Sequence, residues 1–282
     1  MSDTADCNIA WFNCHAGVAG DMTMASLVDA GADPDEVAST IAGLGVDGYA
    51  LLFERVQRCG VGATWANVVF DRDHDHHDHG PPHRPAREVL ALLDAADLPA
   101  RVRERARRVF LRLAEVEGDI HGVEPAEVGF HEVGALDSIV DVVGVCAALE
   151  SLDIDEVWCS PIAVGHGEIR SSHGLIPNPA PATVALLAGA GAPSRGIDTT
   201  MEVSTPTGVA LMATLATGFG AMPAMSTVSV GYGAGTADTS ERANVVQVVA
   251  GRRSGPGDGV DDEGTPVALV EANIDDVSGE VL

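Results

Sequence analysis

The chain has 282 residues, which is enough for one large domain or two smaller ones with their own hydrophobic cores. Its 42 acidic residues outweigh 16 basic ones, all of them arginine, and the formal net charge is −26. A surface this negative repels phosphate backbones, which excludes nucleic acid as an expected partner. The acidity, the absence of lysine and the few aromatics are typical of proteins from salt-loving organisms.

The five cysteines form no C-x-x-C pair and are odd in number. This usage favours reduced thiols in a cytoplasm over a disulfide framework or a structural zinc site. No basic and apolar leader pattern is present at the start, and no apolar run reaches the roughly 18 residues of a membrane span. We therefore expect a cytoplasmic protein without a membrane partner.

The start of the chain alternates strands and helices. Residues 8–14 form an apolar run typical of a buried strand. A small-residue turn and a helix follow, with Asp21 placed to cap the helix and Gly31 to end it. A second helix starts at Pro34, and the alternating pattern over 49–70 predicts two strands or a hairpin.

The remaining elements continue this alternation. Helical patterns are expected at 85–98, 99–122, 131–154, 180–190 and 204–218. Strand patterns are expected at 156–165, 167–177, 227–235 and 243–251. The alternation predicts an α/β fold, in which a layered mixed sheet carries flanking helices.

Polar segments divide the chain further. Residues 1–70 would form the first α/β unit of the main domain, and 86–253 the remainder of that domain. Between them, 71–85 is a His/Asp-rich segment that we expect to be disordered, because it has no apolar side chain except proline. Residues 254–266 would be a linker, and 267–282 would begin a truncated C-terminal domain.

The His/Asp-rich segment holds five of the ten histidines. Imidazole nitrogen binds Ni²⁺, Cu²⁺ and Zn²⁺ without sharp selection, so the cluster predicts a metal collector, with a solvated charged linker as the alternative. The expected metal ligands are His74, His76, His77, His79 and His83.

A second group of polar residues lies in the middle of the chain. Asp137 and Asp141 are four residues apart and so share one helix face, close after His131. His166 and His173 lie in a glycine-bearing loop. Helix starts suit anions, and histidines with carboxylates suit metals; helix capping and turn formation are the alternative explanation.

Glycine-rich turns supply a third set of candidates. Thr205, Thr207 and Gly208 enter a helix after Pro206, and 229–238 is a second such turn. Backbone amides at turns of this kind hold phosphate groups. Neither turn matches a P-loop or a dinucleotide fingerprint, so tight turns explain them almost equally well.

Several of these segments, in one collinear order, resemble the LarC nickel-insertion family. They are WFNCHAGVAGDMTMASLVDAGAD, HEVGALDSIVDVVGVCAALESL, SPIAVGHGEIRSSHGLIPNPAPATVALLAG, STPTGVALMA, VGYGAGTAD and VEANIDDVSGE. Two departures stand out. Asn13 replaces the usual aspartate of the family, and the C-terminal region that the family uses for oligomerisation and CTP binding is almost absent.

The resemblance implies a nickel chelatase, a cyclometallase of the lyase class. Such a protein inserts Ni²⁺ into the pincer ligand pyridinium-3,5-bisthiocarboxylic acid mononucleotide, forming nickel–sulfur and nickel–carbon bonds with CTP hydrolysis and Mg²⁺ or Mn²⁺. The product is the cofactor of lactate racemase, the implied recipient. A homo-oligomer and a C-terminal partner polypeptide are further expectations.

The same resemblance assigns roles to the candidates. The expected catalytic residues are His131, Asp137, His166 and His173. The expected ligand-binding residues are Thr205, Thr207 and Gly208, with the histidines of the His/Asp-rich segment as nickel ligands. Two alternatives stay open: a nickel metallochaperone or storage protein without chelatase activity, and a nucleotide hydrolase in which the histidines are incidental.

Overall fold

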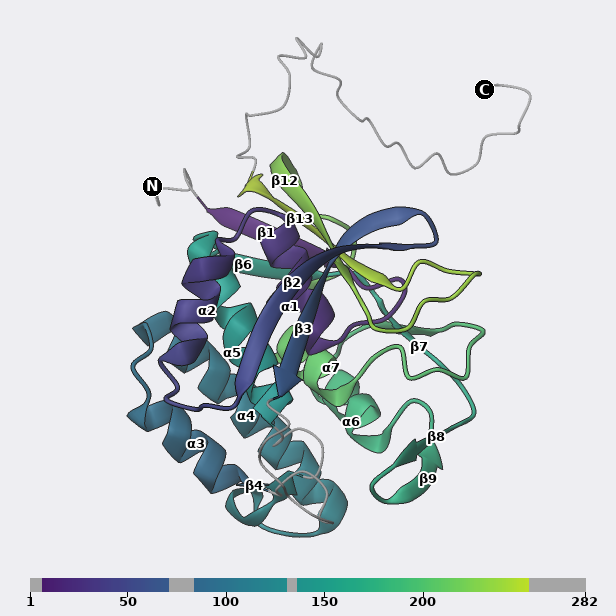
Figure 1. The fold of residues 1–282 in the computed structure, drawn as a ribbon. Coiled ribbons are helices and arrows are strands. Elements are labelled where there is room, and N and C mark those ends of the chain that lie inside the picture. Colours follow the sequence, from purple (N-terminus) through teal and green to yellow (C-terminus); the bar gives the residue numbers. More distant parts are fainter. Residues whose placement is uncertain (1–6, 71–83, 131–135, 254–282) are drawn as a thin grey trace, which may run out of the picture.

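The computed structural model describes residues 7–70, 84–130 and 136–253 (Figure 1). The predicted linker 254–266, the predicted domain start 267–282 and most of the His/Asp-rich segment lie outside the described residues. The last two residues of that segment, Arg84 and Pro85, form the short strand β4. Within the described ranges, no helix is long and apolar enough to cross a membrane.

A seven-stranded mixed sheet forms the centre of the fold, as the alternating pattern predicts. Its strand order is β11-β6-β1-β13-β12-β3-β2. Strands β11, β6 and β1 run parallel, β13 is antiparallel to both of its neighbours, and β2 and β3 form an antiparallel hairpin. The strands are β1 (Asn8–Asn13), β2 (Tyr49–Arg58), β3 (Val61–Phe70), β6 (Glu156–Cys159), β11 (Ala216–Phe219), β12 (Met225–Ala234) and β13 (Val245–Arg253).

The described part of the chain also contains three two-stranded pairs. These are β4 (Arg84–Pro85) with β5 (Gly129–Phe130), β7 (Ile162–Val164) with β10 (Ser194–Gly196), and β8 (Glu168–Ser171) with β9 (Gly174–Pro177). The predicted single strand at 156–165 is wrong, because it is divided between β6 and β7. The division falls at Pro161, which has no amide hydrogen to continue a ladder.

Helices pack against the sheet and against one another (Figure 1). They are α1 (Gly20–Asp29), α2 (Pro34–Ala42), α3 (Ala86–Ala95), α4 (Ala100–His121), η1 (Pro125–Glu127), α5 (Leu136–Ser151), α6 (Pro181–Ala190) and α7 (Pro206–Leu215). Helix α1 lies on β12, β3 and β13, and α4 contacts α3, α5, α6 and α7. The buried side chains of α4 recur every three or four residues, as an amphipathic helix requires.

The predicted capping role of Asp21 is wrong. The N-cap position of α1 is Ala19, which makes no side-chain cap, and Asp21 lies in the first turn. There its carboxylate accepts a 2.8 Å hydrogen bond from the amide of the next residue, Met22. By contrast, Asp33 caps α2 by accepting hydrogen bonds from the backbone amides of Asp35 and Glu36. Helix α2 starts at Pro34, as predicted.

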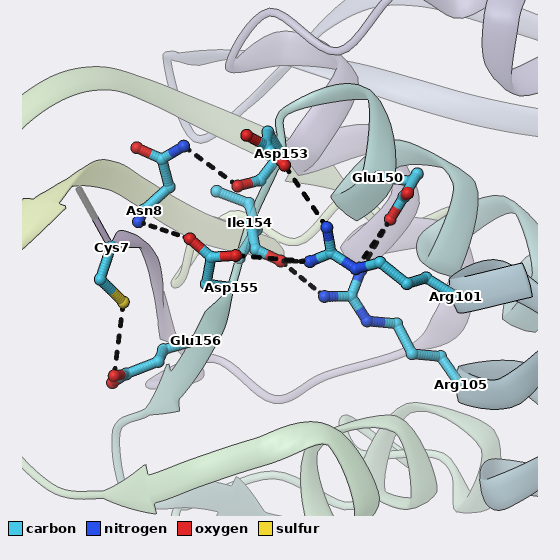
Figure 2. Close-up of polar contacts among 9 residues, drawn as sticks. All are labelled: Cys7, Asn8, Arg101, Arg105, Glu150, Asp153, Ile154, Asp155 and Glu156. Carbon is cyan, nitrogen blue, oxygen red and sulfur yellow. Dashed lines mark hydrogen bonds and ion pairs between the residues drawn. The ribbon is translucent and has the colours of Figure 1, made fainter. Parts of the chain in front are cut away.

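An arginine-centred network joins α4 to the end of α5 and the start of β6 (Figure 2). Arg105 donates to the carbonyl oxygen of Ile154 at 2.5 Å. Arg101 donates to the same oxygen at 2.8 Å. Its guanidinium also lies 3.2, 3.4 and 3.6 Å from the carboxylates of Glu150, Asp153 and Asp155. These contacts fix α4 relative to the end of α5 and the start of β6.

Candidate functional site

Three helix N-termini meet at one cavity of about 360 Å³, which we call the acidic cavity. Helices α1, α5 and α7 contact one another (Figure 1). Their first turns and β3 line the cavity. The lining residues are Ala19, Gly20, Asp21, Trp65, Ala66, Asn67, Val68, Asp137, Ser138, Asp141, Glu202, Thr205, Pro206, Thr207 and Thr236.

Backbone hydrogen bonds place the start of α7 beside the start of α1. The amide of Val18 donates to the carbonyl of Val203 at 2.9 Å, and the amide of Thr205 donates back to the carbonyl of Val18 at 3.0 Å. Gly208 permits this approach: a Cβ there would lie 2.4 Å from the Val18 oxygen and 2.6 Å from the Ala19 Cα. The two helix starts therefore share one edge of the cavity.

A second glycine brings α5 against α1. A Cβ on Gly20 would lie 2.7 Å from both the Cβ and Oδ2 of Asp141. The Asp141 carboxylate, which is partly buried, accepts a hydrogen bond from the backbone amide of Asp21. The carboxylate of α5 thus satisfies an amide that the first turn of α1 would otherwise leave without an intrahelical partner.

Two carboxyl groups of the cavity have strongly altered acidity. Burial, and less so the charge of Asp137, raises the pKa of Asp21 to about 6, although hydrogen bonds from backbone amides oppose the shift. Burial first, then the charges of Asp21 and Asp137, raises the pKa of Asp141 well above its usual value. Near neutral pH the cavity therefore carries less negative charge than its carboxyl count suggests.

The acidic cavity combines two opposite electrostatic features. The N-terminal ends of three helices, which carry partial positive charge, border one space, an arrangement that suits phosphate or another anion. Asp137 and Glu202 place acidic groups at the same space, which suits a cationic group. The cavity can therefore hold a ligand that carries both signs of charge.

The structure brings three of the predicted site residues together here. Asp137 lines the cavity, and its Oδ1 accepts from the amide of Ser138 at 2.8 Å. Thr205 and Thr207 also line it, and Thr205 caps α7 by accepting from the amide of Gly208 at 3.2 Å. Gly208 does not line the cavity; it packs against the backbone of Val18 and Ala19. Asp137 and Asp141 do share one helix face, as predicted.

The two other described candidates lie elsewhere. The ring of His166, between β7 and β8, is 3.0 Å from the Oδ1 of Asp198. His173, in the β8–β9 turn, lies in a separate pocket of about 200 Å³ with His121 of α4, their ring centroids 5.0 Å apart. His131 and the five histidines of the predicted metal loop lie outside the described residues.

Sequence reasoning missed Asp21 and His121 as site residues. The sequence could have indicated Asp21, because an aspartate that lies in the first turn of a helix without capping it can contact a ligand. It gave no such indication for His121, since a histidine at a helix end is ordinary. In the described ranges, no group of three or more His, Cys, Asp or Glu side chains is arranged to hold a metal ion.

Comparison with known proteins gives a consistent result. Residues 10–282 match the model of a family described as nickel insertion protein. A protein of Geobacter metallireducens is 43% identical over 276 residues, which cover 97% of this chain and 67% of the relative. The pyridinium-3,5-bisthiocarboxylic acid mononucleotide nickel insertion protein of Staphylococcus saprophyticus is 39% identical over 277 residues, covering 98% and 66%.

A second protein of that name, from Staphylococcus epidermidis, is 37% identical over 272 residues, which cover 96% of this chain and 65% of the relative. The chain thus spans about two thirds of the length of these relatives. No solved structure matches the chain.

Proposed function

The chain belongs to the nickel insertion protein family, and on this premise we propose that it inserts nickel into pyridinium-3,5-bisthiocarboxylic acid mononucleotide. Two relatives carry the name of that reaction. Nickel is here a substrate that the protein transfers to the organic ligand. The observation that carries the proposal is the acidic cavity, where three helix N-termini and several carboxyl groups face one space.

The charges of this mononucleotide match those of the cavity. Its pyridinium ring is cationic, whereas its phosphate and two thiocarboxylates are anionic. The partial positive charge at the starts of α1, α5 and α7 suits the phosphate. The acidic groups contributed by Asp137 and Glu202 suit the pyridinium ring.

In the proposed reaction nickel replaces a hydrogen on a ring carbon of the mononucleotide. The cavity also offers an acceptor for the proton that this carbon loses. Asp21, with a pKa of about 6, is largely ionised at neutral pH and yet more basic than an ordinary aspartate. That combination suits a general base. In this proposal Asp21 takes the ring proton, and the hydroxyl and backbone amide of Thr207 hold the phosphate.

Several finer features belong to the same proposal. They are CTP hydrolysis with Mg²⁺ or Mn²⁺ as the energy source, collection of nickel by the His/Asp-rich segment, assembly into a homo-oligomer, and delivery of the product to lactate racemase. None of the described residues is assigned to CTP.

We expect Asp137→Asn and Thr207→Val each to weaken mononucleotide binding about 10-fold, the loss typical of one interaction with a charged group. Titration calorimetry with the purified chain measures this. Asp94→Asn, an exposed aspartate of α3 that pairs with Arg107 at 3.0 Å, is the matched control and should bind as the parent does. Equal affinity for all four proteins would contradict the proposed cavity.

Turnover is measured separately. The chain is mixed with NiCl₂, CTP, Mg²⁺ and the mononucleotide, and mass spectrometry detects the nickel-containing product. A second arm adds a polypeptide that matches the remaining third of the relatives. Nickel binding without nucleotide binding in either arm would favour the metallochaperone or storage function, which the five clustered histidines also support.

A further inference from the structure

A second pocket, which we call the histidine pocket, lies next to the acidic cavity. It has a volume of about 200 Å³ and brings together the end of α4, the β8–β9 hairpin and the start of α6. Figure 1 shows this hairpin beside α6. His121 comes from the last turn of α4, and His173 is an exposed residue of the hairpin turn.

The spacing of the two imidazoles fits shared coordination of one ion. A metal sits about 2.1 Å from a histidine nitrogen, and hence about 3.2 Å from the ring centre. Two imidazoles at neighbouring positions of one ion, about 90–110° apart, then have ring centres roughly 4.5–5.3 Å apart. The ring centroids of His121 and His173 are 5.0 Å apart and tilted by 40°.

A carboxylate one helical turn away orients the first of these rings. Oε2 of Glu117 lies 3.4 Å from Nε2 of His121. Of the two neutral tautomers, such a partner favours the one with its proton on Nε2 and its lone pair on Nδ1, as carboxylates do behind metal-bound histidines. Nδ1 would then be the ligand atom of His121.

Among the described residues that line the pocket, Glu117 is the one carboxylate. The pocket lies at the C-terminal end of the 22-residue helix α4, where the helix dipole is negative, and the positive N-terminal ends of α6 and α7 border it as well. Glu117 adds a carboxylate, and no arginine lines the pocket among the described residues. A divalent ion with a preference for nitrogen ligands suits the two imidazole donors and the nearby carboxylate.

The histidine pocket also borders the mononucleotide site. Pro206, the first residue of α7, lines both the histidine pocket and the acidic cavity. Two protein ligands leave most coordination positions of an ion open. A ligand with two sulfur donors that arrives from the adjacent cavity can fill those positions, because soft sulfur donors compete well for late first-row metals.

We propose that His121 and His173 form a two-histidine docking site for Ni²⁺, from which the ion passes around Pro206 to the mononucleotide in the acidic cavity. The inference rests on the proposed function for its recipient, and on the geometry of the two histidines for the nickel site itself. It differs from the predicted metal loop, which involves other histidines.

The test measures Ni²⁺ alone. The full chain with His74, His76, His77, His79 and His83 all changed to Asn removes binding by the loop and serves as the parent. Equilibrium dialysis with elemental analysis should find about one Ni²⁺ per chain in this parent. Adding His121→Ala or His173→Ala should weaken the site at least 10-fold, and Glu117→Gln should weaken it about 10-fold or more.

The matched control is His15→Ala, an exposed histidine that follows β1 and does not line this pocket, which should leave nickel binding unchanged. Circular dichroism and mononucleotide binding check that the variants fold; His173→Ala changes only an exposed turn. A parent without Ni²⁺, or His→Ala variants that bind as the parent does, would overturn this inference alone. Nickel binding by His121 and His173 without any mononucleotide binding would instead overturn the proposed function.

Discussion

The raised pKa of Asp21 leads to a prediction about how the free energy of unfolding depends on pH. Its pKa in the folded protein is about 6, above its usual 3.8. Below pH 3.8 the carboxyl is protonated whether folded or unfolded, so it imposes no penalty. As the pH rises through 6, the folded state must hold a buried charge, and stability is lost. Asp21→Asn should therefore raise the free energy of unfolding by about 1–3 kcal/mol at pH 8.

Urea denaturation at pH 8 and at pH 4 measures this effect, and the gain should disappear at pH 4. The new amide oxygen can still accept from the Met22 amide, so helix α1 keeps that bond. The same variant should lose nickel insertion if Asp21 is the base, since stability is commonly sacrificed at functional residues. A variant less stable than the parent at pH 8 would show that the carboxylate is not strained by burial.

The packing of α7 against α1 depends on Gly208, because α7 can approach α1 this closely only without a side chain at that position. Gly208→Ala should lower the free energy of unfolding by about 1–3 kcal/mol, although alanine favours helix, since the Val18 backbone cannot move aside. It should also weaken mononucleotide binding. Chemical denaturation and calorimetry measure the two effects.

The control is another glycine within a helix. At Gly189 of α6 a Cβ would meet only the flexible guanidinium of Arg112, so Gly189→Ala should be neutral or stabilising by up to about 1 kcal/mol. Equal effects of the two substitutions would mean that helix propensity, and not the contact between α1 and α7, decides the outcome.

Much of the element order is predictable from sequence. The alternation over 49–70 predicts two strands or a hairpin, and the structure has the β2–β3 hairpin; the spacing of Asp137 and Asp141 correctly places both on one face of α5. The meeting of α1 with α7 is not predictable in this way, because it depends on backbone bonds between Val18 and residues near 204. No local pattern encodes such a contact.

The predicted catalytic set shows the same limit. Its described members, Asp137, His166 and His173, occupy three separate places, although two of them lie within one glycine-bearing loop in sequence. The loop folds into the β8–β9 hairpin, which carries His173 toward α4, while His166 stays beside Asp198. His166 and His173 are therefore close in the sequence but lie in different places in the structure.

The net charge of −26 makes a prediction for the whole molecule. Screening lengths fall from about 10 Å at 0.1 M salt to about 3 Å at 1 M. Repulsion among the acidic side chains should therefore weaken, and Tm should rise by several degrees between 0.1 and 1 M KCl. Sucrose at matched osmolality strengthens burial without screening charge and should raise Tm less. A Tm that falls or stays constant in KCl would contradict this.

The central sheet also has a consequence for how the protein is made. Strand β1, near the start of the chain, lies between β6 and β13, and it pairs along its whole length with β13, with Asn8 opposite Arg252. A ribosome must release nearly all of the first 253 residues before this ladder can close. Folding is therefore completed late in translation, and until then β1 presents a row of unsatisfied backbone groups to any chaperone or neighbouring nascent chain.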